Sequence, residues 1–325
     1  YLAASRPANT IRGYADDWWV WSCYCREYGI PETSNTAGAL VGFVKWLENK
    51  PPTPPQPNPA RKTKERRWDP NGPSKAQAPS TIDRRITGVV VGLRARGVPA
   101  SDDAKDAARN TLNIYRRKLA EAAETRGTGQ AAPIRTDNLA LIAAKLPDTI
   151  VGVRDRAILL VSYQFGARRS ETANLLVQDI TSHSNGIIVT TRTGKTGGRR
   201  VPIQRARTGS RVPCPVEAWQ AWLTASGIVD GPAFRRIDRY GNVRAQGLSG
   251  DGIGNIIEQA GKRAGIPIHF TGHSIRAGLA TEARARKHDA RTISRITGHS
   301  PTSKVLHDYF REVDEWETAP DDIGF

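Results

Sequence analysis

A run of prolines early in the chain sets the firmest limit on its regular structure. Prolines occupy six of the ten positions from 51 to 60, in the stretch PPTPPQPNPA. Because proline lacks a backbone N–H and fixes its own φ, this stretch neither continues a helix nor forms a central strand. The next seven residues, RKTKERR, carry five basic side chains and one acidic one. We therefore expect residues 50–79 to form an extended insertion, either a solvated linker or a basic loop that touches a polyanion.

Apolar residues recur at helical spacing on both sides of this insertion. The pattern predicts helices over residues 9–28, 36–47, 80–96 and 101–125. Ser80 is the expected N-cap of the third helix, and Ser101 or Asp102 that of the fourth. The fourth helix has an expected apolar face that contains Ile114, Leu119 and Ala122. Residues 1–126 are therefore predicted to form a small, basic, all-helical domain.

A second domain is expected after a linker over residues 127–134, which is rich in glycine, alanine and proline. The pattern then predicts helices over 136–146 and 153–165. Between 186 and 203 it becomes that of a β-hairpin, because two apolar runs flank a Gly-Lys-Thr-Gly-Gly turn.

The remainder, from 216 to 310, is mostly helical in pattern, and Trp219 and Trp222 lie one turn apart as core residues do. The predicted fold class is therefore mainly α (α+β). The second domain spans 135–311 and combines many helices with a small antiparallel hairpin. A tail over 312–325 follows, which is expected to be either a disordered terminus or a segment whose apolar Trp316 and Phe325 dock on a neighbouring protomer.

The charge of the chain indicates a polyanionic partner. It carries 48 Lys and Arg against 32 Asp and Glu, for a formal net charge of +16 and a pI of about 10.1. Such an excess suits nucleic acid or an anionic membrane surface. The mean hydropathy is −0.50, and no apolar run is long enough to span a bilayer, which favours nucleic acid. The three cysteines, Cys23, Cys25 and Cys214, suit neither a disulfide framework nor a four-ligand zinc site. This cysteine usage is typical of a reducing, cytoplasmic compartment.

Three short motifs in the second half combine guanidinium, imidazole and phenol groups. In GARRSE, residues 166–171, a helical pattern ends at a glycine and Arg168 precedes a new helix, where its fork and the helix N-terminus can both attract a phosphate. In HSIR, His273 and Arg276 are three residues apart and share one helix face. Both side chains can therefore reach the same anion.

The third motif is Gly298-His299, followed ten residues later by Tyr309. A phenol has a pKa of about 10, so its ionisation at pH 7 costs roughly 4 kcal/mol unless a base or a nearby cation assists. A histidine and two arginines can supply that assistance. Guanidinium groups can also neutralise the oxygens of a phosphodiester, as a metal ion does at other sites.

Other motif interpretations fail on their own residues. Gly194-Lys195-Thr196 lacks the P-loop glycine five positions earlier, where Val189 stands. The HSIR segment lacks the final glycine of a nucleophile elbow. His269 and His273 have zinc-ligand spacing, but Phe270 replaces the glutamate that a zincin helix requires.

In this order, GARRSE, a basic hairpin turn, HSIR, TGH and a late tyrosine resemble the catalytic set of the tyrosine recombinases, or phage-type integrases. The resemblance covers the whole second half of the chain. It implies a tyrosine recombinase catalytic domain over 135–311. The first half is similar, less specifically, to the helical core-binding domain of Cre-like members, which clamps DNA.

The resemblance implies a role for each matching residue. Arg168 and Arg276 would clamp the scissile phosphate, and Lys195, in the turn of the hairpin, would be the general acid for the departing 5′-oxygen. Tyr309 would attack the phosphorus.

Three further residues match the family pattern around these groups. His273 and His299 would bind the phosphate and manage the proton of Tyr309, and Glu171 would brace its neighbours. No cofactor and no metal ion are implied.

The implied activity is site-specific recombination of double-stranded DNA without ATP. The strands would be cleaved and rejoined through a 3′-phosphotyrosine and a Holliday junction, by a homotetramer on two sites, at the nucleoid. A topoisomerase IB-like enzyme or a hairpin telomere resolvase shares this chemistry, and a catalytically inactive DNA-binding regulator shares the fold.

Three departures from the family pattern stand out. Tyr309 lies ten residues after His299, where nine is usual, so the turn at Ser300-Pro301-Thr302 has to absorb one residue. Ala277 stands where many relatives have a histidine, and the proline-rich insertion is unusual. Basic side chains at several places are predicted DNA contacts: Arg61, Lys62, Lys64, Arg66, Arg67, Arg84, Arg85, Arg199 and Arg200.

Overall fold

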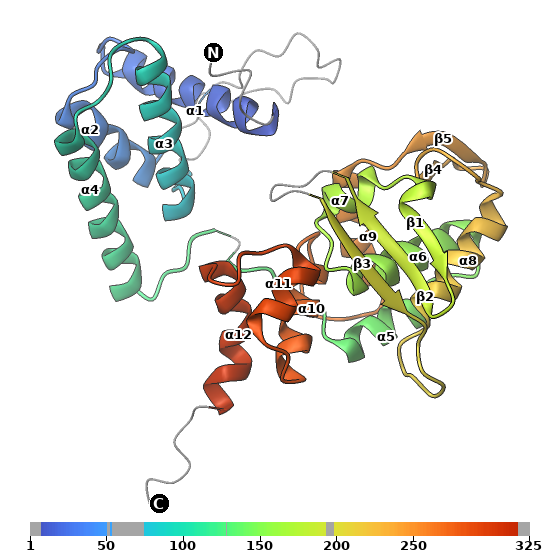
Figure 1. The fold of residues 1–325 in the computed structure, drawn as a ribbon. Helices are drawn as coiled ribbons and strands as arrows, with labels where there is room; N and C mark the ends of the chain where they lie inside the picture. The colour runs from blue at the N-terminus through green and yellow to red at the C-terminus, as the bar shows by residue number, and fades with distance from the viewer. Residues whose placement is uncertain (1–7, 51–52, 54–74, 128, 193–197, 318–325) are drawn as a thin grey trace, which may run out of the picture. The chain divides into compact units, whose positions relative to one another are not determined.

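The computed structural model describes residues 8–50, 53, 75–127, 129–192 and 198–317. The chain divides into two compact units, residues 1–129 and 130–325. Figure 1 shows that the first unit consists of helices and that the second combines helices with small antiparallel sheets. The mainly helical fold with a small β component is thus confirmed.

Four helices build the first unit: α1 (Ala8–Glu27), α2 (Ala37–Glu48), α3 (Pro79–Ala95) and α4 (Asp102–Glu121). Helix α1 packs on α3, and α2 packs on α4. The aromatic residues Trp21, Tyr24, Phe43 and Trp46 form the centre of their core. Gly88 of α3 permits a close crossing with α1, because a Cβ at this position would lie 2.6 Å from the Cβ of Asp17.

Two local predictions in this unit are corrected by the structure. Helix α3 begins at Pro79 after the extended residue Ala78, so Ser80 is not its N-cap. Proline at the first helical position needs no hydrogen-bond partner for its nitrogen. Ile114 is 48% exposed and Ala122 is also exposed, so of the predicted face of α4 only Leu119 is buried. Ser101 does cap α4, by accepting a hydrogen bond from the Ala104 N–H.

The ends of the proline-rich insertion meet in the first unit. The N–H of Lys75 donates to the carbonyl of Lys50 at 2.7 Å, in an isolated antiparallel bridge. Residues 54–74, which include the predicted DNA contacts Arg61, Lys62, Lys64, Arg66 and Arg67, lie outside the described part of the chain.

The second unit is arranged around a central helix, α6 (Ile150–Gln164), most of whose residues are buried. Helices α5 (Thr136–Ala144), α8 (Pro215–Ser226), α9 (Gly250–Arg263) and α10 (Ser274–Ala285) pack against it. The other helices of this unit are α7 (Arg169–Asn174), which packs on α9, and α11 (Ala290–Thr297) and α12 (Lys304–Glu317), which pack on α10. Trp219 and Trp222 of α8 are in the core, as predicted. None of the helices in the described ranges is long and apolar enough to cross a bilayer.

A three-stranded antiparallel sheet covers one side of this unit (Figure 1). Its order is β1 (Ile180–His183), β2 (Gly186–Thr191) and β3 (Arg199–Gln204), and a 3₁₀ turn, η1 (Val177–Asp179), leads into it. Strands β2 and β3 form the predicted hairpin, with Ile187 opposite Ile203. The short strands β1, β4 (Arg235–Ile237) and β5 (Val243–Gly247) were not predicted, because their sequences are too short and polar to show an alternating pattern.

Candidate active site

Arg168 and Glu171 form one wall of the candidate site, at the start of α7. The Arg168 N–H donates to Glu171 Oε2 at 2.8 Å, and Arg168 Nη1 donates to Glu171 Oε1 at 2.6 Å. Burial opposes ionisation of Glu171, but the Arg168 N–H and the charges of Arg199 and Arg168 outweigh it and lower the pKa of this carboxyl group. Arg168 Nη2 also reaches the Gly298 carbonyl, at 3.5 Å, and so lies beside the TGH segment.

Arg276 lies near Arg168, on the first turn of α10, and only 2% of its surface is exposed. Its Nη1 donates to the carbonyl of Gly166 at 2.9 Å and to that of Thr297. Its Nη2 is buried and has no hydrogen-bond partner within the described residues. Burial and the charge of Arg168 lower the pKa of Arg276 to about 9, so the group is still a cation at pH 7.

His299 is held between Arg276 and Thr297 in a defined tautomer. Arg276 Nε donates to His299 Nε2 at 3.1 Å, so the ring proton is on Nδ1, 3.0 Å from Thr297 Oγ1. Thr297 Oγ1 accepts this proton because its own hydroxyl donates to the Ile293 carbonyl. Burial and the charges of Arg276 and Arg168 lower the pKa of His299 to about 3. His299 is therefore neutral at pH 7.

Tyr309 lies beside His299, with ring centroids 5.9 Å apart, despite the ten-residue spacing. A turn closed by the Ser303 N–H and the Ser300 carbonyl absorbs the extra residue before α12 begins at Lys304. Thr281 Oγ1 of α10 donates to the Tyr309 carbonyl at 3.1 Å and thus ties α12 to α10. Burial raises the pKa of Tyr309, and the charges of Arg276 and Arg168 offset part of the rise. The phenol is therefore protonated at neutral pH until a base acts on it.

Asp308, the residue at the usual nine-residue spacing, faces other partners. Its carboxylate accepts hydrogen bonds from Lys304 and Arg311 along the exposed side of α12. The geometry therefore keeps Tyr309, and no neighbour of it in sequence, as the candidate nucleophile.

His273 is the N-cap residue of α10, and its side chain is exposed. Desolvation of its ring and the charges of Arg169, Arg276 and Arg168 lower its pKa. The charges of Arg168 and Arg276 act on His273, His299 and Tyr309 alike, so all three side chains lie within reach of these two cations. Lys195 belongs to residues 193–197, outside the described chain.

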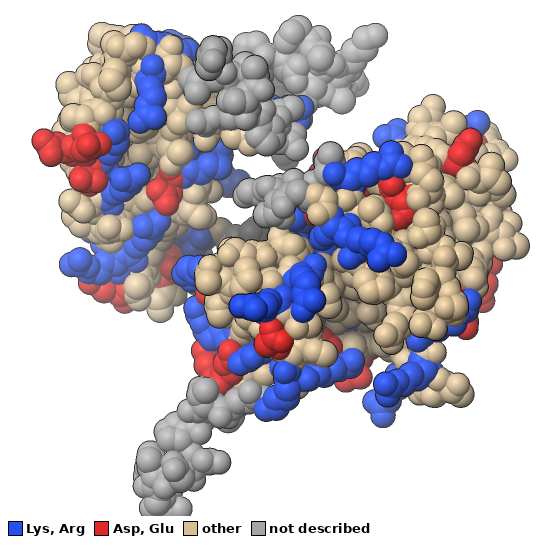
Figure 2. Space-filling view, viewed as in Figure 1, with Lys and Arg blue, Asp and Glu red and all other residues tan. Residues whose placement is uncertain are grey.

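The predicted DNA contacts within the described chain differ in their surroundings. The structure corrects the prediction that Arg199 is a DNA contact on the surface. Its guanidinium faces inward and binds Glu171. Arg85 is largely buried against Asp17, whereas Arg84 is half exposed beside the same carboxylate. Arg200 is exposed. Figure 2 shows Lys and Arg side chains spread over the visible face of each unit.

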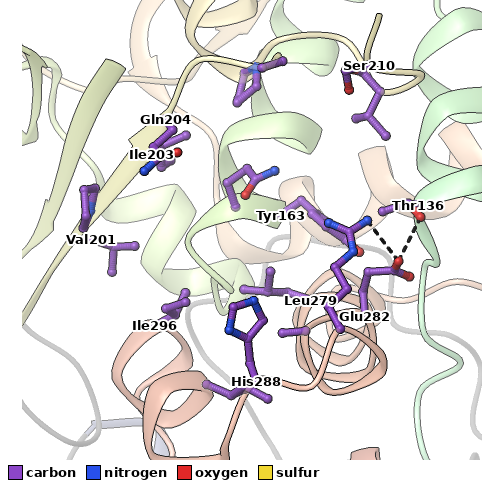
Figure 3. Close-up of a pocket in the computed structure, with 18 of the residues that line it drawn as sticks. Thr136, Tyr163, Val201, Ile203, Gln204, Ser210, Leu279, Glu282, His288 and Ile296 are labelled. Carbon is purple, nitrogen blue, oxygen red and sulfur yellow. Dashed lines mark hydrogen bonds and ion pairs between the residues drawn. The ribbon is translucent and has the colours of Figure 1, made fainter. Parts of the chain in front are cut away.

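A separate cavity of about 400 Å³ lies between the end of α6, β3, α10 and α11 (Figure 3). Glu282 binds Thr136 and Arg286 at its edge, and the buried Tyr163 hydroxyl has no hydrogen-bond partner among the residues that the structure describes. The catalytic candidates do not line this cavity. The described residues contain no group of three or more His, Cys, Asp or Glu arranged to hold a metal ion.

Sequence reasoning missed two residues that hold the candidate groups in place. Thr297 fixes the tautomer of His299, and Thr281 fixes the backbone of Tyr309. It also placed Arg199 among the exposed DNA contacts, although the alternation of residues along its strand indicates a buried side chain. Arg199 shares its strand parity with the buried Val201 and Ile203, whereas Arg200 alternates to the exposed face.

Comparison with known proteins places the second unit in a family. Residues 134–315 match the model of the "Phage integrase family". The chain is 28% identical over 324 residues to an "Integrase/recombinase xerD homolog" of Selenomonas ruminantium. This match covers 96% of this chain and 84% of the relative. It is 29% identical over 161 residues to "Tyrosine recombinase XerD" of Mycobacterium tuberculosis. That second match spans 48% of this chain and about half, 47%, of the relative.

Two solved structures share the fold. One is the XerH site-specific recombinase in a post-cleavage complex with palindromic difH substrate, with a TM-score of 0.52, 14% identity and coverage of 74% of this chain and 67% of that one. The other is the Tn1549 transposon integrase with a circular intermediate DNA, with a TM-score of 0.52, 13% identity and coverage of 86% and 82%. Since the family model matches more than half of the chain, this protein belongs to the phage integrase family, the tyrosine recombinases.

Proposed function

We propose that this protein is a site-specific DNA recombinase whose strand cleavage uses the cluster around Arg276. The observation that carries this proposal is the buried Arg276 Nη2, which has no partner among the described residues and lies beside Arg168, His299 and Tyr309. A buried N–H without an acceptor is costly, and a phosphodiester oxygen would supply the acceptor.

In the proposed reaction, Tyr309 Oη attacks the phosphorus, and the bond from phosphorus to the 5′-oxygen breaks. The products are a 3′-phosphotyrosine and a free 5′-hydroxyl. Arg168 and Arg276 neutralise the non-bridging oxygens. The proton of Tyr309 passes to the neutral imidazole of His273, whose lowered pKa keeps it unprotonated at pH 7. His299 stays beside the phosphate without taking this proton, because Arg276 and Thr297 already engage both of its ring nitrogens. Lys195 donates the proton that the departing oxygen requires.

Rejoining reverses these steps with the 5′-hydroxyl of a partner strand as the attacking group. The phosphotyrosyl bond keeps the energy of the broken phosphodiester, so no nucleotide is hydrolysed. We propose that four protomers on two DNA sites carry out two such exchanges through a Holliday junction at the nucleoid. The first unit would act as the DNA clamp, and the tail over 312–325 would dock on a neighbouring protomer. The exposed Arg84 and Arg200 would contact the DNA backbone.

A covalent capture experiment tests the proposed function without a known target site. The protein is incubated with a pool of randomised duplexes nicked on one strand, so that cleavage releases a short fragment and traps the protein on DNA. Adducts that survive denaturation are recovered and sequenced. The wild-type protein should give adducts enriched in one sequence, Tyr309→Phe should give none while it binds that duplex normally, and Tyr240→Phe, at an exposed tyrosine, should behave as wild type.

The alternatives predict different results. A regulator with this fold would bind DNA without any adduct from the wild-type protein. An adduct that persists in Tyr309→Phe would remove Tyr309 from the nucleophile role. Binding by backbone neutralisation should also weaken by an order of magnitude or more between roughly 50 and 200 mM salt.

A further inference from the structure

Two buried arginines join the same two segments of the second unit, one residue apart. Arg276 Nη1 donates to the carbonyls of Gly166 and Thr297. Arg199 Nη1 donates to the carbonyls that immediately precede these in sequence, those of Phe165 and Ile296. The end of α6 and the end of α11 are thus held together twice, by side chains from α10 and from β3.

These four carbonyls belong to helix ends. Phe165 is the C-cap of α6, and α11 ends at Thr297. Carbonyls at a helix C-terminus lack intrahelical partners and carry partial negative charge, so a guanidinium is a well-matched partner for them. The side chain of Arg199 is only 10% exposed, and its guanidinium lies 5.1 Å from the centre of the Phe165 ring. Water therefore has little access to replace it.

Arg199 has a third contact, which reaches the candidate site. Its Nη2 donates to Glu171 Oε2 at 2.5 Å, the same oxygen that accepts the Arg168 N–H. The other oxygen of Glu171 accepts Arg168 Nη1. Arg199 thus fixes the carboxylate that orients Arg168, and its bond to Ile296 fixes the segment that carries His299.

We propose that Arg199 is a positioning residue for strand cleavage, which orients Arg168 through Glu171 and holds the segment that carries His299 without itself contacting DNA. This inference rests on the proposed function. It separates Arg199 from Arg200, which follows it on the same strand but is exposed and stays a candidate DNA contact. Arg199 should therefore affect the cleavage rate, and Arg200 should affect binding.

The test compares Arg199→Gln, Arg199→Lys and the wild-type protein on the duplex recovered by covalent capture. Single-turnover cleavage at saturating protein gives the rate, and a separate titration gives the Kd. Misplacement of a reacting group by about 1 Å can cost about 100-fold in rate, and we expect a loss of that size for Arg199→Gln with a Kd within about 2-fold of wild type. Lysine keeps the charge but not the fork that joins three acceptors, so Arg199→Lys should lose about 10-fold.

A charge-relieved substrate separates positioning from a general loss of packing. When a neutral methyl group replaces one non-bridging oxygen of the scissile phosphate, the reaction depends less on Arg168. If Arg199 acts through Arg168, the rate deficit of its variants should shrink on this duplex. Arg211→Gln removes one charge from a side chain that is 88% exposed, beyond the other end of β3, and serves as the matched control with wild-type behaviour.

Thermal melting checks that the variants are folded, and Arg199→Lys carries the test if Arg199→Gln is not. A folded Arg199→Lys that cleaves at the wild-type rate would overturn the proposal, as would variants that change only the Kd. The proposal also fails if the rate deficit on the methylphosphonate duplex is as large as that on the ordinary duplex. The absence of any adduct from the wild-type protein would instead reject the proposed function itself.

Discussion

The two units each bury one carboxylate between two arginines, with different consequences. In the first unit, Asp17 of α1 accepts hydrogen bonds from Arg84 at 2.5 Å and from Arg85 at 3.4 Å. In the second, Glu171 binds Arg168 and Arg199. Each cluster has one carboxylate and two guanidinium groups, but only the second borders histidines and a tyrosine.

The difference lies in what else the arginines and the carboxylate contact. Asp17 is fully buried at the crossing of α1 and α3, where Gly88 packs against it, so its cluster fixes how two helices pack. Glu171 accepts a backbone N–H as well, and Arg168 extends past it to the Gly298 carbonyl beside His299. An arginine–carboxylate cluster thus becomes part of a reactive site when one of its cations also borders groups that handle protons.

Substitution of Glu171, the carboxylate of the second cluster, should have the largest effect, and that effect is on the rate of DNA cleavage. Glu171→Gln keeps the size of the side chain but removes the charge that holds Arg168 and Arg199. We expect the single-turnover cleavage rate to fall by about 100-fold, because Arg168 is no longer held where charge develops on the phosphate. Binding to the same duplex, measured by titration, should change little. A wild-type rate in Glu171→Gln would show that Arg168 needs no orienting partner.

The matching change in the first unit should act on stability. Asp17→Asn leaves Arg85, whose side chain is 14% exposed, without its charged partner. Loss of Asp17 leaves the charge of Arg85 unpaired, but Arg84 is half exposed and can turn to water, and burial already opposes ionisation of Asp17. We therefore expect a loss of at most about 2 kcal/mol, largest near pH 4. Hydrogen exchange of the full chain, resolved by peptide, would show faster exchange in α1 and α3. If Asp17→Asn instead lowers the cleavage rate at saturating protein, the two clusters are coupled and the contrast between them fails.

Periodicity predicts most of the helices but not every buried face. In α4 the buried residues Ala104, Ala108, Leu112, Tyr115 and Leu119 follow helical spacing, yet the sequence directs attention to the more apolar Ile114. Tyr115 is inside because its hydroxyl has partners, the Gln77 carbonyl and Arg126. Those partners come from other segments, so a local pattern does not reveal them.

The site shows the same division between local and distant information. The order of GARRSE, HSIR, GH and a late tyrosine resembles the catalytic set of the tyrosine recombinases, and this resemblance predicts which side chains meet. The inward turn of Arg199 depends on carbonyls at Phe165 and Ile296, far from it in sequence. Strand parity alone places Arg199 on the buried side, but the acceptors that give it a role are visible only in the folded chain.

The pH dependence of stability should show the smallest effect, but it distinguishes the two buried carboxylates most directly. Burial raises the pKa of Asp17, and the charges of Arg84 and Arg85 offset it only in part, so the folded protein binds this proton more tightly than the unfolded chain does. The contribution of Asp17 to stability therefore falls as pH rises from about 4 through its raised pKa. The pKa of Glu171 is lowered, so its contribution is complete above the unfolded value and is lost as pH falls below about 4.

Hydrogen exchange of the full chain at a series of pH values should show how the stability contribution of each carboxylate changes with pH. The exchange is read in α1 and α3 for Asp17 and in α6 for Glu171. Subtracting Asp17→Asn from wild type should leave a stability difference that decreases with rising pH. Subtracting Glu171→Gln should leave one that increases with rising pH. Two differences of the same sign would mean that the arginines dominate both carboxylates equally. The backbone N–H that only Glu171 accepts would then not be what distinguishes the two clusters.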